Sequence, residues 1–417
     1  MSGASTTVVV ADAAELVVGP ATGASDDTEP GEGPLEVLED AAFAAIDGEV
    51  AAVGPTNEVV REYPPENADE AIDASGKAVV PGFVDPHTHA VFAGDRSDEF
   101  EARLRGKTYQ EILADGGGIL RTVQATREAS DEELLETLLA HLDVMLARGS
   151  TTVEVKSGYG LETETELRLL EVIDRADDEH PVDLVATYLG AHAVPESRDD
   201  EEYVDEVVEE HLPAVADQGI AEFCDVFCEE GVFDVEASRR VLEAGTAAGL
   251  TPKVHAEEFT RHGGAQLAAE VEAASADHLL YATAEDVEAL VDAGTVPVLL
   301  PGTAFGLGER YADAREFLEA GAPVALATDF NPNCHARSMA FVQTLSCLEI
   351  GTTPAEALLG ATRNAALAVD RDDGTGTLRE GAPADALVLE VPSYVHVAYR
   401  FDTPAIETVI KNGRQVW

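Results

Sequence analysis

The sequence is short of positive charge. It has 26 Lys and Arg residues against 81 Asp and Glu residues, so the formal net charge at pH 7 is −55. Nucleic-acid-binding proteins need a basic surface to neutralise phosphates, so this balance argues against a nucleic-acid partner. A disordered acidic chain would lack the 45% of hydrophobic residues found here. We therefore expect a folded protein with an acidic surface, suited to concentrated salt, from a salt-loving source.

Long apolar runs are also missing. No segment approaches the roughly 20 apolar residues that cross a bilayer, so no membrane partner is expected. Residues 1–5 contain no basic region followed by an apolar run, which argues against a signal peptide. There are four cysteines, at positions 224, 228, 334 and 347. The first two are too far apart to pair along the strand expected there, and we interpret all four as reduced thiols of a cytoplasmic protein.

From residue 81 onward, short apolar runs alternate with longer segments of helical period. Alternation of about eight strands with helices over about 250 residues is typical of an α/β fold of the (β/α)8 TIM-barrel type. A doubly wound open sheet is the alternative. The expected strands are 79–84, 151–156, 183–190, 223–227, 251–255, 276–280, 296–300 and 324–327. The expected helices are 130–148, 163–177, 203–218, 235–248, 263–273, 284–293, 311–320, 338–349 and 354–370.

The two ends of the chain have a different pattern. Short β-like runs separated by Gly, Pro and Asp fill residues 1–80, where no helical period of useful length appears. Similar runs return at 386–391 and 406–410. We therefore predict a small β-sandwich domain built from residues 1–80 and 371–417, and a barrel domain spanning residues 81–370.

Polar side chains follow many of the expected barrel strands. In a TIM barrel the reactive groups lie at the carboxyl ends of the strands. At or near these ends stand His87, His89, Tyr159, His192, His255, His278 and Asp329. So many polar residues at consecutive strand ends predict one functional site.

Four of these residues form a plausible metal-binding set. Side chains two apart on an extended chain share a face, so His87 and His89 are placed to hold one ion. With His255 and Asp329 they would form a mononuclear site for Zn²⁺ or iron, with a position left for water. A bound metal lowers the pKa of water toward about 7, which gives a hydroxide nucleophile. The competing interpretation is a set of hydrogen-bonded core residues.

Hydrolysis at such a site also requires groups that transfer protons. Glu258, three residues after a candidate ligand, and His278 are the candidates. The alternative for Glu258 is one more exposed acid in a very acidic chain. For His278 the alternative is a hydrogen bond that orients a metal ligand.

A resemblance to the amidohydrolase superfamily lies in the run PGFVDPHTHAVFAGDR (81–96). Within that superfamily, the chain resembles the imidazolonepropionase family in the stretches 96–119, 154–161 (EVKSGYGL), 188–192 (YLGAH), 254–259 (VHAEEF), 275–279 (SADHL) and 327–332 (ATDFNP). The resemblance implies hydrolysis of the cyclic amide of 4-imidazolone-5-propanoate to N-formimidoyl-L-glutamate, a step of histidine degradation. It also implies one Zn²⁺ or Fe²⁺/Fe³⁺ per subunit and a homodimer.

The resemblance further implies a set of substrate-binding residues. Arg96 and Tyr159 would hold the propanoate, which suits the bidentate pairing of Arg with carboxylates. The other members of the implied set are Tyr109, His192, Glu258 and Asn331.

The chain departs from the family pattern after the last expected barrel strand. Asn333 and Cys334 stand where the family has Gly and a small hydroxyl residue. Asn tolerates positive φ better than most residues, so we expect the turn to survive the replacement of Gly by Asn333. Lys156 is interpreted as structural, since the resemblance implies a single metal.

Two other functions remain open. Ring deaminases of the same superfamily share the metal pattern, although a neutral nucleobase would not need Arg96 or Tyr159. A catalytically inactive barrel that serves as a scaffold is the other alternative, but such a protein should have lost metal ligands.

Overall fold

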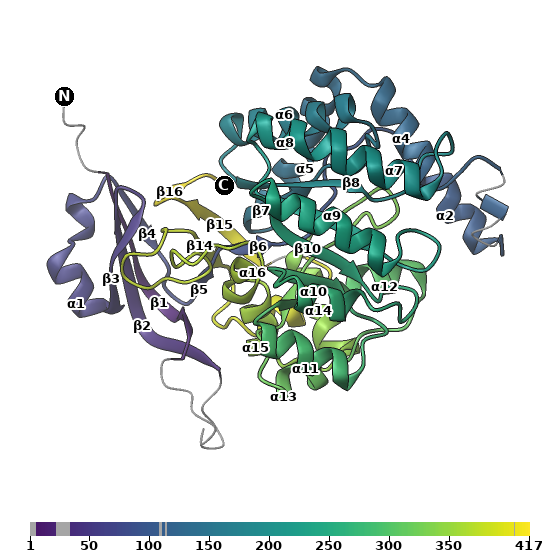
Figure 1. Ribbon diagram of the computed structural model, residues 1–417. Coiled ribbons are helices and arrows are strands. Elements are labelled where there is room, and N and C mark those ends of the chain that lie inside the picture. Colours follow the sequence, from purple (N-terminus) through teal and green to yellow (C-terminus); the bar gives the residue numbers. More distant parts are fainter. Residues whose placement is uncertain (1–5, 22–33, 108–110, 113–114, 404) are drawn as a thin grey trace.

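The computed structural model describes residues 6–21, 34–107, 111–112, 115–403 and 405–417. Figure 1 shows two parts: a ring of strands surrounded by helices, and a separate sheet that contains both ends of the described chain. Tyr109, one of the predicted substrate-binding residues, lies outside the described residues.

The first part is a parallel barrel. Its strands pair in sequence order, each with the next. They are β6 (Phe83–Asp85), β7 (Ser150–Lys156), β8 (Asp183–Ala191), β9 (Phe223–Cys228), β10 (Thr251–Ala256), β11 (Ser275–His278), β12 (Val296–Leu299) and β13 (Ala325–Leu326). A parallel bridge between Thr88 and Phe330 joins the first strand to the last just beyond their ends. The predicted barrel is thereby confirmed.

Helices cover the outside of this barrel (Figure 1). They are α2 (Ser97–Leu104), α4 (Ile119–Glu128), α5 (Asp131–Leu146), α6 (Thr163–Glu179), α7 (Asp200–Glu206), the π turn η2 (Val207–His211), α8 (Leu212–Gln218), α9 (Val235–Ala247), α10 (Gly264–Glu270), α11 (Ala284–Ala293), α12 (Pro301–Leu307), α13 (Ala314–Glu319), α14 (Met339–Glu349), α15 (Pro354–Gly360), α16 (Arg363–Leu367) and α17 (His396–Tyr399). Within the described residues, no helix has the length and apolar character needed to cross a membrane.

The second part is a mostly antiparallel sheet, as predicted for the chain ends. Its order is β16-β15-β14-β5-β1-β2-β3, with β4 beside β1. Its elements are β1 (Thr7–Pro20), β2 (Leu35–Ile46), β3 (Glu49–Pro55), α1 (Thr56–Glu62), η1 (Pro65–Asn67), β4 (Glu70–Asp73), β5 (Ala78–Pro81), β14 (Ala386–Leu389), β15 (Ile406–Lys411) and β16 (Arg414–Gln415). One apolar core contains Val8 and Phe43 from one half of the sheet and Val388 and Ile410 from the other, so the sheet folds over on itself.

Three details of the prediction were wrong. The expected helix 354–370 is two helices, α15 and α16, with Thr362 in a non-helical conformation between them. The expected strand 79–84 is two strands, because the chain leaves the end sheet after β5 and enters the barrel at β6. Gly82 occupies the junction, where a Cβ atom would overlap the hydroxyl of Thr151. Helix α1 lies in the region where no helix was expected, and its seven residues are too few to show a clear period. The predicted domain limits at residues 80 and 371 remain a prediction.

Candidate metal centre and active site

The four predicted metal ligands meet at one end of the barrel. His87 and His89 follow β6, His255 lies in β10, and Asp329 follows β13. Asp329 Oδ1 lies 3.6 Å from His87 Nε2 and 3.5 Å from His89 Nε2. The Nε2 atoms of His89 and His255 are 3.4 Å apart. All four side chains are buried, so the arrangement excludes bulk water while gathering the ligand atoms around one point.

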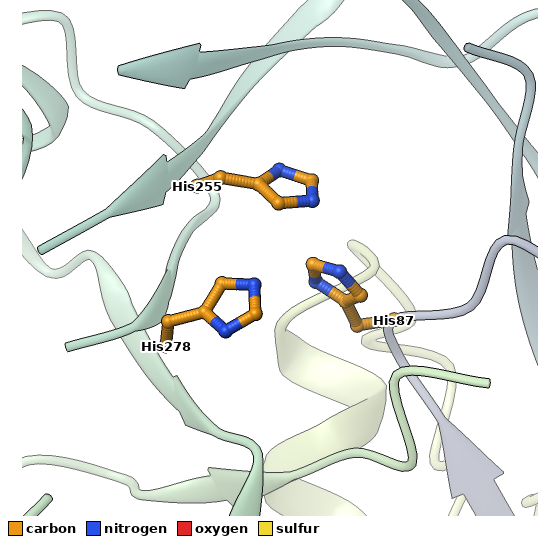
Figure 2. A group of neighbouring side chains, drawn as sticks. All are labelled: His87, His255 and His278. Carbon is orange, nitrogen blue, oxygen red and sulfur yellow. The ribbon is translucent and has the colours of Figure 1, made fainter. Parts of the chain in front are cut away.

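His278 reaches the same point. Figure 2 shows its ring facing those of His87 and His255, and one ligand atom from each of the three lies within 4.8 Å of the others. His278 Nε2 is also 3.7 Å from Glu258 Oε2. The structure therefore brings both predicted proton-transfer residues to the edge of the ligand cluster.

The cluster has the chemistry that a divalent metal requires. His87 Nε2 is buried and has no hydrogen-bond partner among the described residues. Burial lowers the pKa of His87, His89 and His278 well below the usual 6.5, which keeps these imidazoles neutral. Neutral imidazole is the form that coordinates metals. With the carboxylate of Asp329, this donor set suits Zn²⁺ or iron.

Two carboxylates that the sequence analysis missed lie beside the histidines. Asp277 Oδ2 lies 2.6 Å from His87 Nδ1, and Asp225 Oδ2 lies 3.0 Å from His255 Nδ1. The Asp277 contact is a hydrogen bond that fixes the tautomer of His87 and leaves its Nε2 for the metal. Asp225 is a close charged neighbour of His255, whose Nδ1 makes no hydrogen bond within the described residues. Both aspartates stand in strand segments, β11 and β9, whose neighbouring side chains are buried.

The side chain of Lys156 lies close to both of these carboxylates. Its Nζ is 2.9 Å from Glu154 Oε1, 2.8 Å from Asp225 Oδ2 and 3.8 Å from Asp277 Oδ2. Lys253 lies 2.9 Å from the same Glu154 oxygen. Burial alone would lower the pKa of Lys156, but the charges of Asp225 and Glu154 raise it. Lys156 is thus a buried counter-ion, in agreement with the structural role expected for it.

Several non-glycine residues at the carboxyl ends of the strands adopt positive φ. The values are 54° for Glu257, 79° for His278, 60° for Leu279 and 49° for Asp329. Such conformations are costly for residues with a Cβ and persist only where the surroundings enforce them. The Glu257 carboxylate accepts hydrogen bonds from the backbone N–H groups of the loop after β10. Glu258 follows Glu257 in this loop and lines the cavity beside the ligand cluster.

The predicted substrate-binding residues line a cavity of about 120 Å³ beside the ligand cluster. The described members of the predicted set there are Arg96, Tyr159, His192, Glu258 and Asn331. Burial raises the pKa of the Glu258 carboxyl group well above its ordinary range. Burial also lowers the pKa of His192 to about 3, which keeps that ring neutral.

Local hydrogen bonds position Arg96 and Tyr159. The Arg96 guanidinium donates to Glu99 Oε2 at 3.0 and 2.7 Å, and its side chain is only 9% exposed. The loop that carries Tyr159 is held by Glu166, whose carboxylate accepts from the N–H groups of Gly158, Gly160 and Leu161. Glu99 and Glu166 were not identified from the sequence, where they resemble ordinary surface acids.

Asn331 organises the segment after β13. Its Nδ2 donates to the carbonyl and the Oδ1 of Asp329 at 2.8 and 3.0 Å. Its Oδ1 accepts from the N–H groups of Asn333 and Cys334 at 2.7 and 2.9 Å. Asn333 does not adopt positive φ, and the left-handed residue at this strand end is Asp329. The Asn331 side chain holds the turn together instead.

Comparisons with known proteins show the family to which the chain belongs. Residues 78–416 match the amidohydrolase family. The chain is 66% identical to an imidazolonepropionase from Haloarcula marismortui, over 98% of this chain and 95% of that protein. It is 61% identical to one from Halobacterium salinarum (97% and 96% covered) and 51% identical to one from Geobacillus kaustophilus (92% and 91%). The first two sources are consistent with the expected salt-loving origin.

Solved structures share the fold. A triazine hydrolase variant aligns with a TM-score of 0.75 at 18% identity, covering 98% of this chain and 94% of that one. The ochratoxinase of A. niger aligns with a TM-score of 0.71 at 19% identity, covering 99% and 95%. From its match to the family and its identity to these relatives, the chain belongs to the amidohydrolase family and, within it, to the imidazolonepropionases.

Proposed function

We propose that the chain hydrolyses 4-imidazolone-5-propanoate to N-formimidoyl-L-glutamate. The observation that carries this proposal is a buried arginine, Arg96, in the same cavity as the ligand cluster. A substrate with a carboxylate needs a cation to hold it, most of all in a chain of net charge −55. Relatives at 66% and 61% identity bear the name of this activity.

One Zn²⁺ or Fe²⁺/Fe³⁺ ion would be held by His87, His89, His255 and Asp329. The unpartnered Nε2 of His87 and the neutral imidazoles support this assignment. When bound, such an ion acts as a Lewis acid toward water and toward the ring carbonyl. The two metals differ little in the ligands that they accept, so the identity of the ion is a matter for metal analysis.

Glu258 and His278 would move the protons. Hydrolysis forms a C–O bond from water to the ring carbonyl carbon and breaks the C–N bond of the cyclic amide. Glu258 is placed to accept a proton from the attacking water and to pass it to the departing ring nitrogen. Burial raises the pKa of its carboxyl group, which makes the carboxylate a stronger proton acceptor than an exposed glutamate. His278, 3.7 Å away, would stabilise the developing charge and share the proton.

Arg96 and Tyr159 would hold the propanoate. A guanidinium has five N–H donors. Glu99 accepts from Nε and from one terminal nitrogen, which fixes the plane of the group and leaves donors for a second carboxylate. His192 lies against His89, with ring centroids 4.9 Å apart, and is placed to contact the imidazolone ring.

The test is a turnover assay in molar KCl with freshly prepared 4-imidazolone-5-propanoate. Loss of ultraviolet absorbance and identification of N-formimidoyl-L-glutamate are the expected results. Removal of metal with a chelator should abolish conversion, and Zn²⁺ or Fe²⁺ should restore it. Ammonia release from a nucleobase by the same preparation, without conversion of the imidazolone, would replace this proposal with a ring deaminase. A folded protein that retains no metal would favour the scaffold alternative.

We also propose a homodimer in the cytoplasm. The four cysteines are free thiols and three of them are buried, which suits a reducing compartment. The dimer is supported by the family resemblance, and light scattering in molar KCl would measure the mass directly.

A further inference from the structure

A second, larger cavity adjoins the candidate active site. It has a volume of about 500 Å³, and we call it the outer cavity. Its walls come from the segment before α2, from α2 itself, from α12, from the segment after β13 and from α14. It is lined by Phe92, Gly94, Asp95, Arg96, Ser97, Phe100, Arg103, Gly302, Phe305, Gly306, Pro332, Asn333, Cys334, His335, Ala336 and Phe341.

The two cavities share a wall. Arg96, Asn333 and Cys334 line both the outer cavity and the inner cavity of about 120 Å³ beside the ligand cluster. Sites for small molecules usually occupy about 300–1,000 Å³. The inner cavity alone falls below that range, and among the described residues the wall at Arg96 opens to the outer cavity, which gives room for the tail of a substrate whose ring reaches the ligand cluster.

Arg103 is the second arginine of the outer cavity. Its Nε is buried without a hydrogen-bond partner, and it forms no ion pair in the part of the chain described here. Other arginines of this region are paired: Arg105 binds Glu101, and Arg121 binds Asp98 at 2.8 Å. Burial and the neighbouring charge of Arg96 lower the pKa of Arg103, while the nearby charge of Glu99, which is ion-paired with Arg96, opposes this shift. In a chain with 81 acidic residues, an arginine left without an acidic partner beside another arginine marks a place for an anion from outside.

We propose that Arg103, in the outer cavity, binds the substrate carboxylate together with Arg96, which lines both cavities. This inference rests on the proposed function. Phe100 and Phe305, 53% and 59% exposed, provide apolar surface at the mouth, beside which the methylene groups of the tail can pass. Asp95 also lines the outer cavity, but its carboxylate accepts from the N–H of Ser97. Arg103 is thus a residue that selects for substrates carrying a carboxylate.

Two substrates and three variants test this role. The substrates are 4-imidazolone-5-propanoate and the corresponding propanamide, which keeps the ring and loses the charge. Arg103→Gln should raise KM for the propanoate about tenfold or more, with kcat within about twofold, because a charge-assisted contact is lost. KM for the propanamide should change less than about twofold. Arg103→Lys should recover most of the affinity, and Arg105→Gln, an exposed arginine of the same segment, should match the wild type.

A merely structural role for Arg103 would change both substrates equally, and that result would overturn the inference. An unchanged KM for the propanoate in Arg103→Gln would overturn it as well. The affinity for glutarate, measured by calorimetry, provides a readout that does not depend on turnover. Arg103→Gln should weaken this affinity about tenfold. Failure of the wild type to convert either imidazolone would reject the proposed function. Glutarate affinity would then decide separately whether Arg103 binds carboxylates.

Discussion

Replacing Asp277 with Asn should weaken metal binding about tenfold. Asp277 Oδ2 lies 2.6 Å from His87 Nδ1, and both side chains are fully buried. A hydrogen bond to a charged group contributes about 1.5–3 kcal/mol and a neutral one about 0.5–1.5 kcal/mol. The substitution keeps the shape and removes the charge, so the loss is about 1–1.5 kcal/mol, which corresponds to about tenfold in affinity. Substitution of residues that orient metal ligands commonly costs about 10–100-fold.

The assay is competition for Zn²⁺ with a chromophoric chelator in molar KCl. The variant should fold, because Lys156 keeps its contacts with Glu154 at 2.9 Å and Asp225 at 2.8 Å. Asp286→Asn is the matched control. Asp286 lies in the first turn of α11, and its buried carboxylate accepts a hydrogen bond from Arg261. It should lose stability but keep its metal affinity. A Zn²⁺ affinity of Asp277→Asn within twofold of the wild type would refute the reasoning.

Four further outcomes are expected. Glu258→Gln should keep its metal and lower kcat about 10²-fold or more, and near wild-type turnover would remove Glu258 from the mechanism. Arg96→Ala should raise KM with a smaller effect on kcat, and an unchanged KM would place the carboxylate elsewhere. The melting temperature should rise between dilute buffer and 1 M KCl, because salt shortens the Debye length to about 3 Å and screens the net charge of −55; equal values would contradict this. Burial lowers the pKa of His141 to about 4, so the free energy of unfolding should fall as the pH drops from about 6.5 to about 4. Urea unfolding of His141→Gln should show a flatter dependence over that interval, and an identical slope would exclude His141 as its source.

The sequence sufficed for the barrel and for the ligand cluster because both follow from periodicity. A parallel strand buried on both faces appears as a short apolar run, and a polar residue directly after such a run stands at the end where barrel sites form. His87, His255 and Asp329 were identified in this way, and the structure brings them together. Their roles as ligands remain predictions until a metal is measured.

The residues that hold this site in place could not be identified in the same way. Asp225 and Asp277 lie within apolar strand runs, but they are two of 81 acidic residues, and nothing in their residue type distinguishes them from the others. The usable signal was their position: a charged residue between buried neighbours must be paired, because an unpaired buried charge is costly. Lys156, also in a strand, supplies the pairing, with its Nζ 2.8 Å from Asp225 Oδ2 and 3.8 Å from Asp277 Oδ2. Which side chains of neighbouring strands face each other depends on the strand register of the closed barrel. That register cannot be read from a single sequence.

Closure of the barrel and assembly of the site are one event. The N–H of Asp329 donates to the His87 carbonyl at 3.1 Å, and the N–H of His89 donates to the Phe330 carbonyl at 2.9 Å. These backbone contacts join the ends of the first and last strands and also carry three of the four candidate ligands. The ligand cluster therefore cannot form in a chain whose barrel is open, and an ion that binds only the closed form stabilises that form by mass action. The positive φ of Asp329 lies at the same junction, where metal binding can offset its conformational cost.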